Sequence, residues 1–303
     1  MQSLSDSINT GPQISVLNNH LCDEKKVSIS MLRLDTIHPI VSGNKLFKLQ
    51  YFLQEAKNST HKTIITFGGA YSNHLAATAF ACKEEGLKCI GFVRGEAAER
   101  LSSTLLFCRE NGMKLQYISR SAYQNIDEEF RKDLFTRYGD HTLIPEGGFS
   151  ITGVHGAEGI MQLFNGKDYS HVCCPVGTAT TFAGLIKGNK NEAEIIGFSA
   201  LKNLEDIEDR LKQLNADESK LYRFIPNYHF GGYAKKTPAL IAFMNNFYYD
   251  NKIPLDFVYT AKMMFGVYDL SEENYFAPGS NILCIHTGGL QGNNSLAPGT
   301  LNF

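Results

Sequence analysis

Lys45 is one residue of this 303-residue sequence that could do covalent chemistry. It ends the small-residue turn Ser42-Gly43-Asn44-Lys45, just after the apolar residues Ile40 and Val41. A lysine in a turn is usually a charged surface residue, but a buried amine can lose its proton and become a nucleophile. We therefore take Lys45 as a candidate nucleophile.

A second turn, Gly177-Thr178-Ala179-Thr180-Thr181, offers three hydroxyl groups at the start of a predicted helix. Hydroxyl groups and free backbone N–H groups at such a place suit a phosphate dianion. The turn lacks the lysine of the nucleotide P-loop and the G-x-G-x-x-G spacing of dinucleotide sites. It therefore favours a compact phosphate monoester.

Two more glycine-rich turns follow predicted strands, at residues 67–74 and at 286–289. Glycine is the one compositional excess, with 27 residues. Each turn taken alone could be an ordinary tight connection. Because ligands of open α/β sheets bind beyond the carboxyl ends of the strands, three such turns together predict one shared site.

Short β-branched runs alternate with helical periodicity along most of the chain, which predicts an α/β fold with a mainly parallel sheet. The predicted strands cover 62–67, 88–93, 114–118, 142–144, 171–174, 194–199, 222–225 and 281–286. The predicted helices cover 46–57, 75–85, 102–111, 204–214, 238–250 and 260–270, with a further one from 182. In the first of these helices, Leu46, Leu49, Leu53 and Ala56 form one apolar stripe.

Length and composition limit the class of protein. A chain of this length is expected to form two domains or one large α/β unit. Its 43% hydrophobic and 20% charged residues describe a globular chain. A formal net charge of -2 makes a nucleic-acid partner unexpected. The sequence contains no long apolar run and no signal-like start, so we expect no membrane partner and a cytoplasmic location.

The cysteines and histidines do not show the spacings of a metal site. The seven cysteines include no C-x-x-C pair, and we expect them to be reduced and buried. The nine histidines include no H-x-x-x-H pair. We therefore expect no bound metal.

Seven motifs in this order resemble the 1-aminocyclopropane-1-carboxylate deaminase / D-cysteine desulfhydrase family of pyridoxal-phosphate enzymes. They are Ser42-Gly43-Asn44-Lys45-Leu46-Phe47-Lys48-Leu49, Gly68-Gly69-Ala70-Tyr71-Ser72-Asn73-His74, Pro145-Glu146-Gly147-Gly148, Gly177 to Thr181 with Ala183-Gly184-Leu185, Phe230-Gly231-Gly232-Tyr233, Val258-Tyr259-Thr260-Ala261-Lys262 and His286-Thr287-Gly288-Gly289. One departure is Phe47, where the family has an arginine.

The resemblance implies a two-domain fold type II architecture, similar to the β subunit of tryptophan synthase. The large cofactor-binding domain would comprise residues 1–49 and 147–303, and the small domain residues 50–146. The site would lie between the two domains, and the enzyme would be a homodimer.

The resemblance also implies roles. Lys45 would form the Schiff base with pyridoxal 5'-phosphate, Gly177, Thr178, Ala179, Thr180 and Thr181 would hold its phosphate, Asn73 its phenolic oxygen, and Thr287 would lie by the pyridine nitrogen. Ser72, Asn73 and His74 would donate to the substrate carboxylate, Tyr233 and Tyr259 would contact the substrate, and Lys45, Ser72 and Tyr233 would be catalytic.

Simpler interpretations stay open for two of these residues. Ser72 could be only the N-cap of the helix that follows it. Tyr233 could be a core aromatic residue.

Two positions bear on the substrate. Cyclopropane deaminases of this family have a glutamate after the tyrosine of the Tyr259 motif and a leucine in the His-x-Gly-Gly motif, where this chain has Thr260 and Thr287. A hydroxyl beside the ring nitrogen leaves the ring unprotonated, which suits elimination. We expect elimination from D-cysteine or a related amino acid to give pyruvate, ammonia and sulfide. Cyclopropane deamination, another fold type II elimination or replacement, and a binding protein without catalysis are the alternatives.

Overall fold

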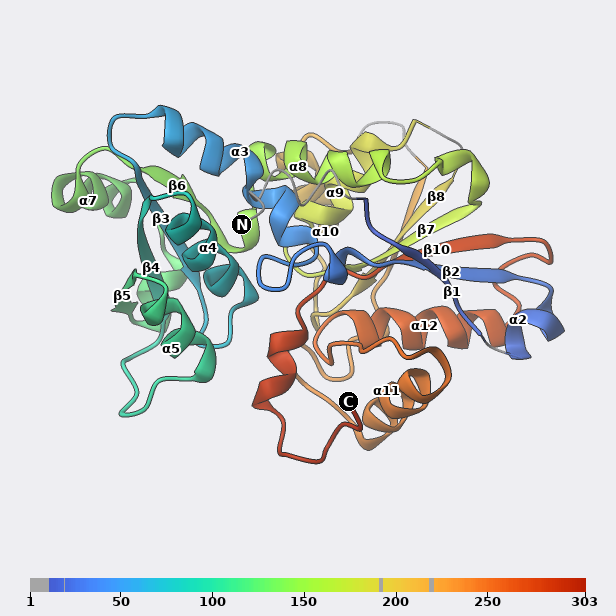
Figure 1. The fold of residues 1–303 in the computed structure, drawn as a ribbon. Helices are drawn as coiled ribbons and strands as arrows, with labels where there is room; N and C mark the ends of the chain where they lie inside the picture. The colour runs from blue at the N-terminus through green and yellow to red at the C-terminus, as the bar shows by residue number, and fades with distance from the viewer. Residues whose placement is uncertain (1–10, 19, 191–192, 218–220) are drawn as a thin grey trace.

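The structure is a computed structural model that describes residues 11–18, 20–190, 193–217 and 221–303. Within these residues the strands form a sheet of six and a sheet of four. The smaller sheet lies wholly between Thr63 and Ile144, and the larger sheet takes strands from both sides of that segment. Figure 1 shows the resulting two lobes, with the smaller sheet at the left.

The larger sheet has the strand order β1-β2-β10-β7-β8-β9. Its strands are β1 (Ile14–Val16), β2 (Ser28–Leu32), β7 (His171–Val176), β8 (Glu194–Ser199), β9 (Tyr222–Ile225) and β10 (Asn281–Ile285). All neighbours run parallel except β1, which pairs antiparallel with β2. Successive side chains point to opposite faces: Val172 and Cys174 join one core cluster and Cys173 the other.

Helices cover both faces of this sheet, as a mostly parallel sheet requires. One face packs against α8 (Ile151–Glu158), α9 (Thr180–Gly188) and α10 (Ile207–Gln213). The other face packs against α2 (His20–Lys25), α11 (Pro238–Asn251) and α12 (Thr260–Glu272). Figure 1 shows α8 and α9 above the sheet and α11 and α12 below it.

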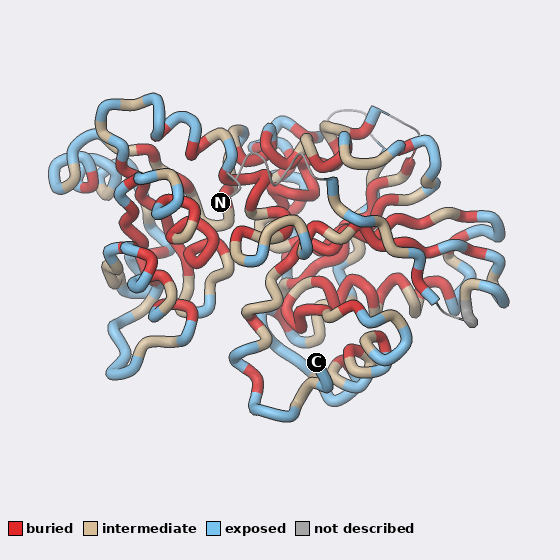
Figure 2. Tube along the Cα trace, in the orientation of Figure 1, coloured by how far each residue is buried: buried red, intermediate tan, exposed pale blue. Residues whose placement is uncertain are grey.

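The smaller sheet is parallel throughout, in the order β5-β4-β3-β6. Its strands are β3 (Thr63–Gly68), β4 (Lys88–Arg94), β5 (Met113–Ile118) and β6 (Thr142–Ile144). One face packs against α4 (Asn73–Glu84) and α5 (Ser103–Glu110), and the other against α6 (Arg120–Gln124) and α7 (Glu128–Tyr138). Figure 2 shows the strands of both lobes as mostly buried segments.

Helix α3 (Asn44–Asn58) connects the two lobes. Its predicted stripe of Leu46, Leu49, Leu53 and Ala56 is buried. The helix contacts α8 of the large lobe as well as α4 and β6 of the small lobe. The expected domain boundary after residue 49 therefore falls inside one continuous helix.

The predicted elements agree with the structure. All eight predicted strands are present, with ends that differ by two residues or fewer, and the predicted helices are present. The sequence interpretation did not include β1, β2, α2, α6, α7 or α8. Among the described residues, no helix is long and apolar enough to cross a membrane.

Candidate active site

A cavity of about 340 Å³ lies where turns from the two lobes meet. Its wall includes the turns that follow β3, β7 and β10, the start of α3 and the segment after β6. Every site residue predicted from the sequence lines it: Lys45, Ser72, Asn73, His74, Gly177, Thr178, Ala179, Thr180, Thr181, Tyr233, Tyr259 and Thr287.

Lys45 lies in the first turn of α3, and Gly43 sets how closely that turn approaches the end of β10. Gly43 has φ 67°, and a Cβ there would clash with the carbonyl oxygen of Thr287. Lys45 Nζ donates to Asn44 Oδ1 at 2.7 Å. Burial lowers the pKa of Lys45 to about 8, although the negative charge of Asp256 acts to raise it. More of this amine is therefore unprotonated at neutral pH than in an exposed lysine.

The turn after β7 presents donors at the start of α9. Ala179 adopts the left-handed conformation with φ 72°, and the helix begins at Thr180. The hydroxyl oxygens of Thr178 and Thr180 are 3.1 Å apart, and Asn44 Nδ2 donates to Thr181 Oγ1 at 2.8 Å. Hydroxyl groups, free N–H groups and the positive end of the helix dipole together favour an anion.

Lys48 is a second lysine on the cavity wall, one turn after Lys45. It is 5% exposed, and its Nζ donates to the carbonyl oxygen of Gly147 at 3.0 Å. Burial and then the charge of Lys45 lower its pKa well below the ordinary value. Sequence reasoning gave Lys48 no role, although its i,i+3 spacing from Lys45 was an available signal.

The turn after β3 carries Ser72 and Asn73. Ser72 is the N-cap of α4, because its Oγ accepts from Leu75 N at 3.2 Å, yet its own proton can still be donated. Asn73 Nδ2 donates to the oxygen of Gly289 at 3.4 Å, whereas Asn73 Oδ1 is buried with no partner among the described residues. A buried unpaired polar atom on a cavity wall marks a place where a bound group can complete the hydrogen bonding.

The side chain of His74 is hydrogen-bonded within the protein. The Thr66 hydroxyl donates to the oxygen of Ile144 at 2.9 Å and so accepts from His74 Nε2 at 2.8 Å. Burial and then the charges of the two cavity lysines lower the pKa of His74 to about 3. The neutral ring therefore leaves Nδ1 as an acceptor, and donation from residue 74 falls to its backbone N–H.

Tyr233 and Tyr259 pack edge to face, with ring centroids 6.2 Å apart. Burial raises the pKa of both hydroxyl groups. Behind them the fully buried Asp256 accepts from the backbone N–H groups of Tyr259 at 2.8 Å and Thr260 at 2.9 Å. Asp256, which the sequence interpretation did not include, therefore fixes the start of α12.

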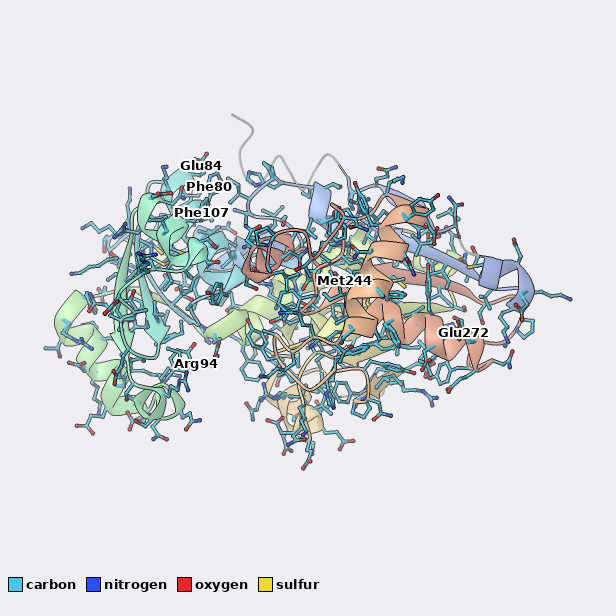
Figure 3. The ribbon with its side chains drawn as sticks, turned by 90° about the horizontal axis from the view of Figure 1, so that it is seen from below. Phe80, Glu84, Arg94, Phe107, Met244 and Glu272 are labelled. Carbon is cyan, nitrogen blue, oxygen red and sulfur yellow. The ribbon has the colours of Figure 1, made fainter. Side chains whose placement is uncertain are left out.

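Two further charged side chains, Arg94 and Glu146, lie on the cavity wall, and the sequence analysis gave neither of them a role. Arg94, the last residue of β4, lies 4.0 Å from Glu146, which follows β6. Figure 3 shows Arg94 on the small-sheet lobe. Glu146 belongs to the quoted motif Pro145-Glu146-Gly147-Gly148 but was given no role. Arg94 belongs to no motif, and only the pairing of β3 with β4 and with β6 brings the two residues together.

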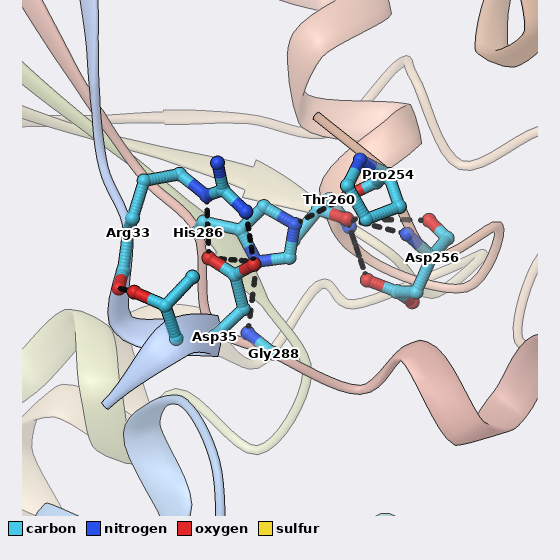
Figure 4. Close-up of polar contacts among 8 residues, drawn as sticks. Arg33, Asp35, Pro254, Asp256, Thr260, His286 and Gly288 are labelled. Atoms are coloured by element: carbon cyan, nitrogen blue, oxygen red, sulfur yellow. Dashed lines mark hydrogen bonds and ion pairs between the residues drawn. The ribbon is translucent and has the colours of Figure 1, made fainter. Parts of the chain in front are cut away.

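His286 fixes the turn that follows β10. Its Nε2 lies 2.8 Å from the oxygen of Pro254, and its Nδ1 accepts from Gly288 N at 3.2 Å. Asp35 lies 3.4 Å from the same Nδ1 and is held by two hydrogen bonds from Arg33. Figure 4 shows that this buried network joins the ends of β2 and β10 to the loop before α12.

Residues 18–288 match the family model described as "Pyridoxal-phosphate dependent enzyme". The chain belongs to this family. It therefore uses pyridoxal phosphate, and the family resemblance inferred from the motifs is confirmed.

The names of two relatives of this chain give different activities. The chain is 29% identical over 292 residues to a putative 1-aminocyclopropane-1-carboxylate deaminase of Thermotoga maritima, covering 90% of this chain and 92% of the relative. It is 29% identical over 296 residues to a D-cysteine desulfhydrase of Klebsiella pneumoniae, covering 90% and 89%. The crystal structure of an ACC deaminase homologue matches with a TM-score of 0.79 at 23% identity, covering 97% and 96%. The last likeness confirms the fold type II architecture.

The cavity fits pyridoxal phosphate. Lys45 offers an amine of lowered pKa for the aldehyde, and the start of α9 offers donors for the phosphate. Asn73 Nδ2 uses one N–H for Gly289, so its second N–H can donate to the phenolic oxygen of the cofactor. The required groups are thus present around one cavity.

Proposed function

We propose that this enzyme eliminates the β-substituent of D-cysteine or a related amino acid, giving pyruvate, ammonia and sulfide. The observation that carries the proposal is the pair of threonines at the two positions that separate elimination from cyclopropane deamination. Thr260 is buried at the start of α12, and Thr287 lies on the cavity wall. The D-cysteine desulfhydrase among the relatives supports the same activity.

Thr260 cannot be exchanged for glutamate without a charge conflict. Its hydroxyl donates to Asp256 Oδ2 at 2.7 Å, and its backbone N–H donates to the same oxygen at 2.9 Å. A glutamate at 260 would bring a second carboxylate against the buried carboxylate of Asp256, where like charges repel strongly. The glutamate of cyclopropane deaminases therefore has no suitable place here.

In the proposed site, Lys45 holds the cofactor, and Lys48 together with Gly177, Thr178, Ala179, Thr180 and Thr181 binds its phosphate. When bound, the cofactor supplies an electron-withdrawing ring that stabilises negative charge at the substrate Cα. Thr287 places a neutral hydroxyl, and no carboxylate, near the ring nitrogen.

Substrate residues follow from the same wall. The start of α4 at Ser72, Asn73 and His74 binds the substrate carboxylate with a hydroxyl and backbone N–H groups. The Lys45 amine, once free, removes the proton from Cα. Tyr233 and Tyr259 line the same cavity and keep their protons, so they can donate to a leaving thiolate.

A steady-state comparison tests this function. Purified enzyme loaded with pyridoxal phosphate receives D-cysteine, L-cysteine or 1-aminocyclopropane-1-carboxylate, and sulfide, pyruvate and 2-oxobutyrate are measured. We expect the highest kcat/KM for D-cysteine. A higher kcat/KM for the cyclopropane amino acid, which the relative from Thermotoga maritima makes the second candidate, would reverse the assignment.

We further propose a homodimer in the cytoplasm, with the two domains divided as the sequence indicates. All seven cysteines are free, which suits a reducing compartment. Sedimentation equilibrium should give twice the chain mass of 33.7 kDa, and a monomeric mass would contradict the dimer. Cell fractionation tests the location.

A further inference from the structure

Arg94 and Glu146 place one positive and one negative side chain on the wall of the active-site cavity. They come from β4 and from the end of β6, the two strands that flank β3. The carboxyl end of β3 leads into the turn with Ser72, and Arg94 Nη2 would lie 3.5 Å from a Cβ at Gly69 in that turn. The charged pair therefore lies beside the region where the substrate carboxylate would bind.

The ion pair between Arg94 and Glu146 is long and partly exposed to solvent. Arg94 Nη1 and Glu146 Oε1 are 4.0 Å apart, and the side chains are 41% and 43% exposed. The guanidinium lies over the Tyr123 ring, 5.2 Å from its centroid, which fixes its plane. Exposed pairs at this separation gain little free energy, so both charges remain available to a ligand.

The charge of the pair selects one kind of ligand. A distal carboxylate alone would be attracted by Arg94 and repelled by Glu146, and a distal ammonium would meet the opposite conflict. A group with both charges satisfies both side chains. Tyr233, which comes from the large lobe, lines the same cavity. Its hydroxyl is close enough to Glu146 and Arg94 for both charges to act on its pKa.

We propose that Arg94 and Glu146 form a subsite for a second amino-acid group on the substrate. The substrate class is then a sulfur-linked bis-amino acid, in which the leaving thiol itself carries an ammonium and a carboxylate. This inference rests on the proposed elimination and names its substrate class.

The elimination balances for such a substrate, with lanthionine as the simplest thioether. The Cβ–S bond breaks as the proton leaves Cα, and the leaving thiolate takes up a proton to give cysteine. The remaining three-carbon unit takes up one water molecule and yields pyruvate and ammonia.

Four thioethers with a D-cysteine half separate the contributions of the two charges. They are meso-lanthionine, S-(2-carboxyethyl)-D-cysteine, S-(2-aminoethyl)-D-cysteine and S-methyl-D-cysteine. Titration of the visible absorbance of the loaded enzyme gives Kd, and pyruvate release gives kcat/KM. We expect lanthionine to bind at least about tenfold tighter than the methyl compound, the gain from a single charge-assisted hydrogen bond at the lower end of its usual range.

The variants Arg94→Gln and Glu146→Gln test which residue meets which charge. Arg94→Gln should lower the preference for the carboxyethyl over the methyl compound, and Glu146→Gln the preference for the aminoethyl compound, each about tenfold. Arg109→Gln and Glu110→Gln, on the exposed end of α5, are the matched controls and should leave both ratios unchanged.

The possible results distinguish a failure of the Arg94–Glu146 subsite from a failure of the proposed elimination reaction. Equal Kd values for all four thioethers, or ratios that neither variant changes, would overturn the subsite even if D-cysteine is eliminated. Preferential binding of lanthionine with no pyruvate from any thioether or from D-cysteine would support the subsite and overturn the proposed elimination.

Discussion

A single desolvated amine explains the reactivity expected of this site. Lys45 has no carboxylate in contact with its Nζ, which donates to the Asn44 amide. Burial penalises the charged form more than Asp256 favours it, so the pKa falls to about 8 from 10.5. The protein thus tunes Lys45 through its surroundings, without a neighbouring base.

The lowered pKa predicts how cofactor loading depends on pH. The protonated Lys45 amine cannot attack an aldehyde, so the rate at which the apo-protein binds pyridoxal phosphate should rise with pH, reach half its maximum near the pKa of about 8 and level off above it. The growth of the visible absorbance band measures this rate. A rate that keeps rising beyond pH 10 would indicate an ordinary, exposed lysine.

Gly43 provides a second prediction. Gly43 and Gly86 have nearly the same φ, 67° and 66°, but a Cβ at Gly86 meets nothing within 4 Å, whereas one at Gly43 meets the Thr287 carbonyl. Gly86→Ala should cost about 1 to 2 kcal/mol of unfolding free energy, the usual cost of this conformation. Gly43→Ala should cost at least about 2 kcal/mol more, because the backbone must move.

Urea unfolding of the two alanine variants makes this comparison. Equal losses for Gly43→Ala and Gly86→Ala would show that the close approach of the Gly43 turn to β10 is absent in solution.

Local patterns were sufficient to find Lys45 and the Thr178 turn, because a turn and the helix after it are specified within a few residues. Arg94 and Asp256 could not be found in that way. Arg94 reaches the cavity only through the register of β3 and β4, and Asp256 through the folding of its loop onto α12. Tertiary contacts that span many residues leave no local signal.

At the scale of elements, two helix N-termini face one cavity. The start of α9 and the start of α4 both present N–H groups that have no acceptor within their own helix. One therefore suits the cofactor phosphate and the other the substrate carboxylate.

The start of α9 should discriminate strongly between pyridoxal phosphate and pyridoxal. Because hydrogen bonds to a charged group are each worth about 1.5 to 3 kcal/mol, we expect pyridoxal to bind about 100-fold more weakly. Inorganic phosphate should compete with pyridoxal phosphate and leave pyridoxal binding unaffected. Similar Kd values for the two aldehydes would place the phosphate elsewhere.

Lys262 holds the loop that carries Tyr233. It is 1% exposed, and its Nζ donates to the oxygens of Gly232 at 2.7 Å and Ala200 at 3.3 Å. Lys262→Met keeps the volume but removes both donors, so unfolding free energy should fall by about 1 to 3 kcal/mol. Hydrogen exchange in residues 226–237 should accelerate relative to Lys235→Met, an exposed control. Unchanged exchange would show that Lys262 does not restrain the loop.

Strands with clear β-branched runs were predicted with nearly correct ends, since a strand buried on both faces is apolar throughout. β1 is a three-residue edge strand, too short to show a period. β2 has the sequence Ser-Ile-Ser-Met-Leu. Its two serines interrupt the apolar run that would have predicted a buried strand, and the strand is buried by pairing with β10.

At the scale of the whole molecule, α3 joins the lobes as a continuous 15-residue helix. Lys45 begins this helix within the large lobe, and the same helix ends against β6 of the small lobe. Lys45, the proposed catalytic lysine, is thus placed by an element that both lobes pack against. Any relative motion of the lobes would move the wall of the cavity that contains Lys45.

The most direct test of the proposed site is to locate the cofactor on the chain. The enzyme is loaded with pyridoxal phosphate, reduced with borohydride to fix the bond between cofactor and lysine, digested and mapped by mass spectrometry. We predict that the modification lies on Lys45. Modification of Lys48, Lys262 or another lysine in place of Lys45 would contradict it.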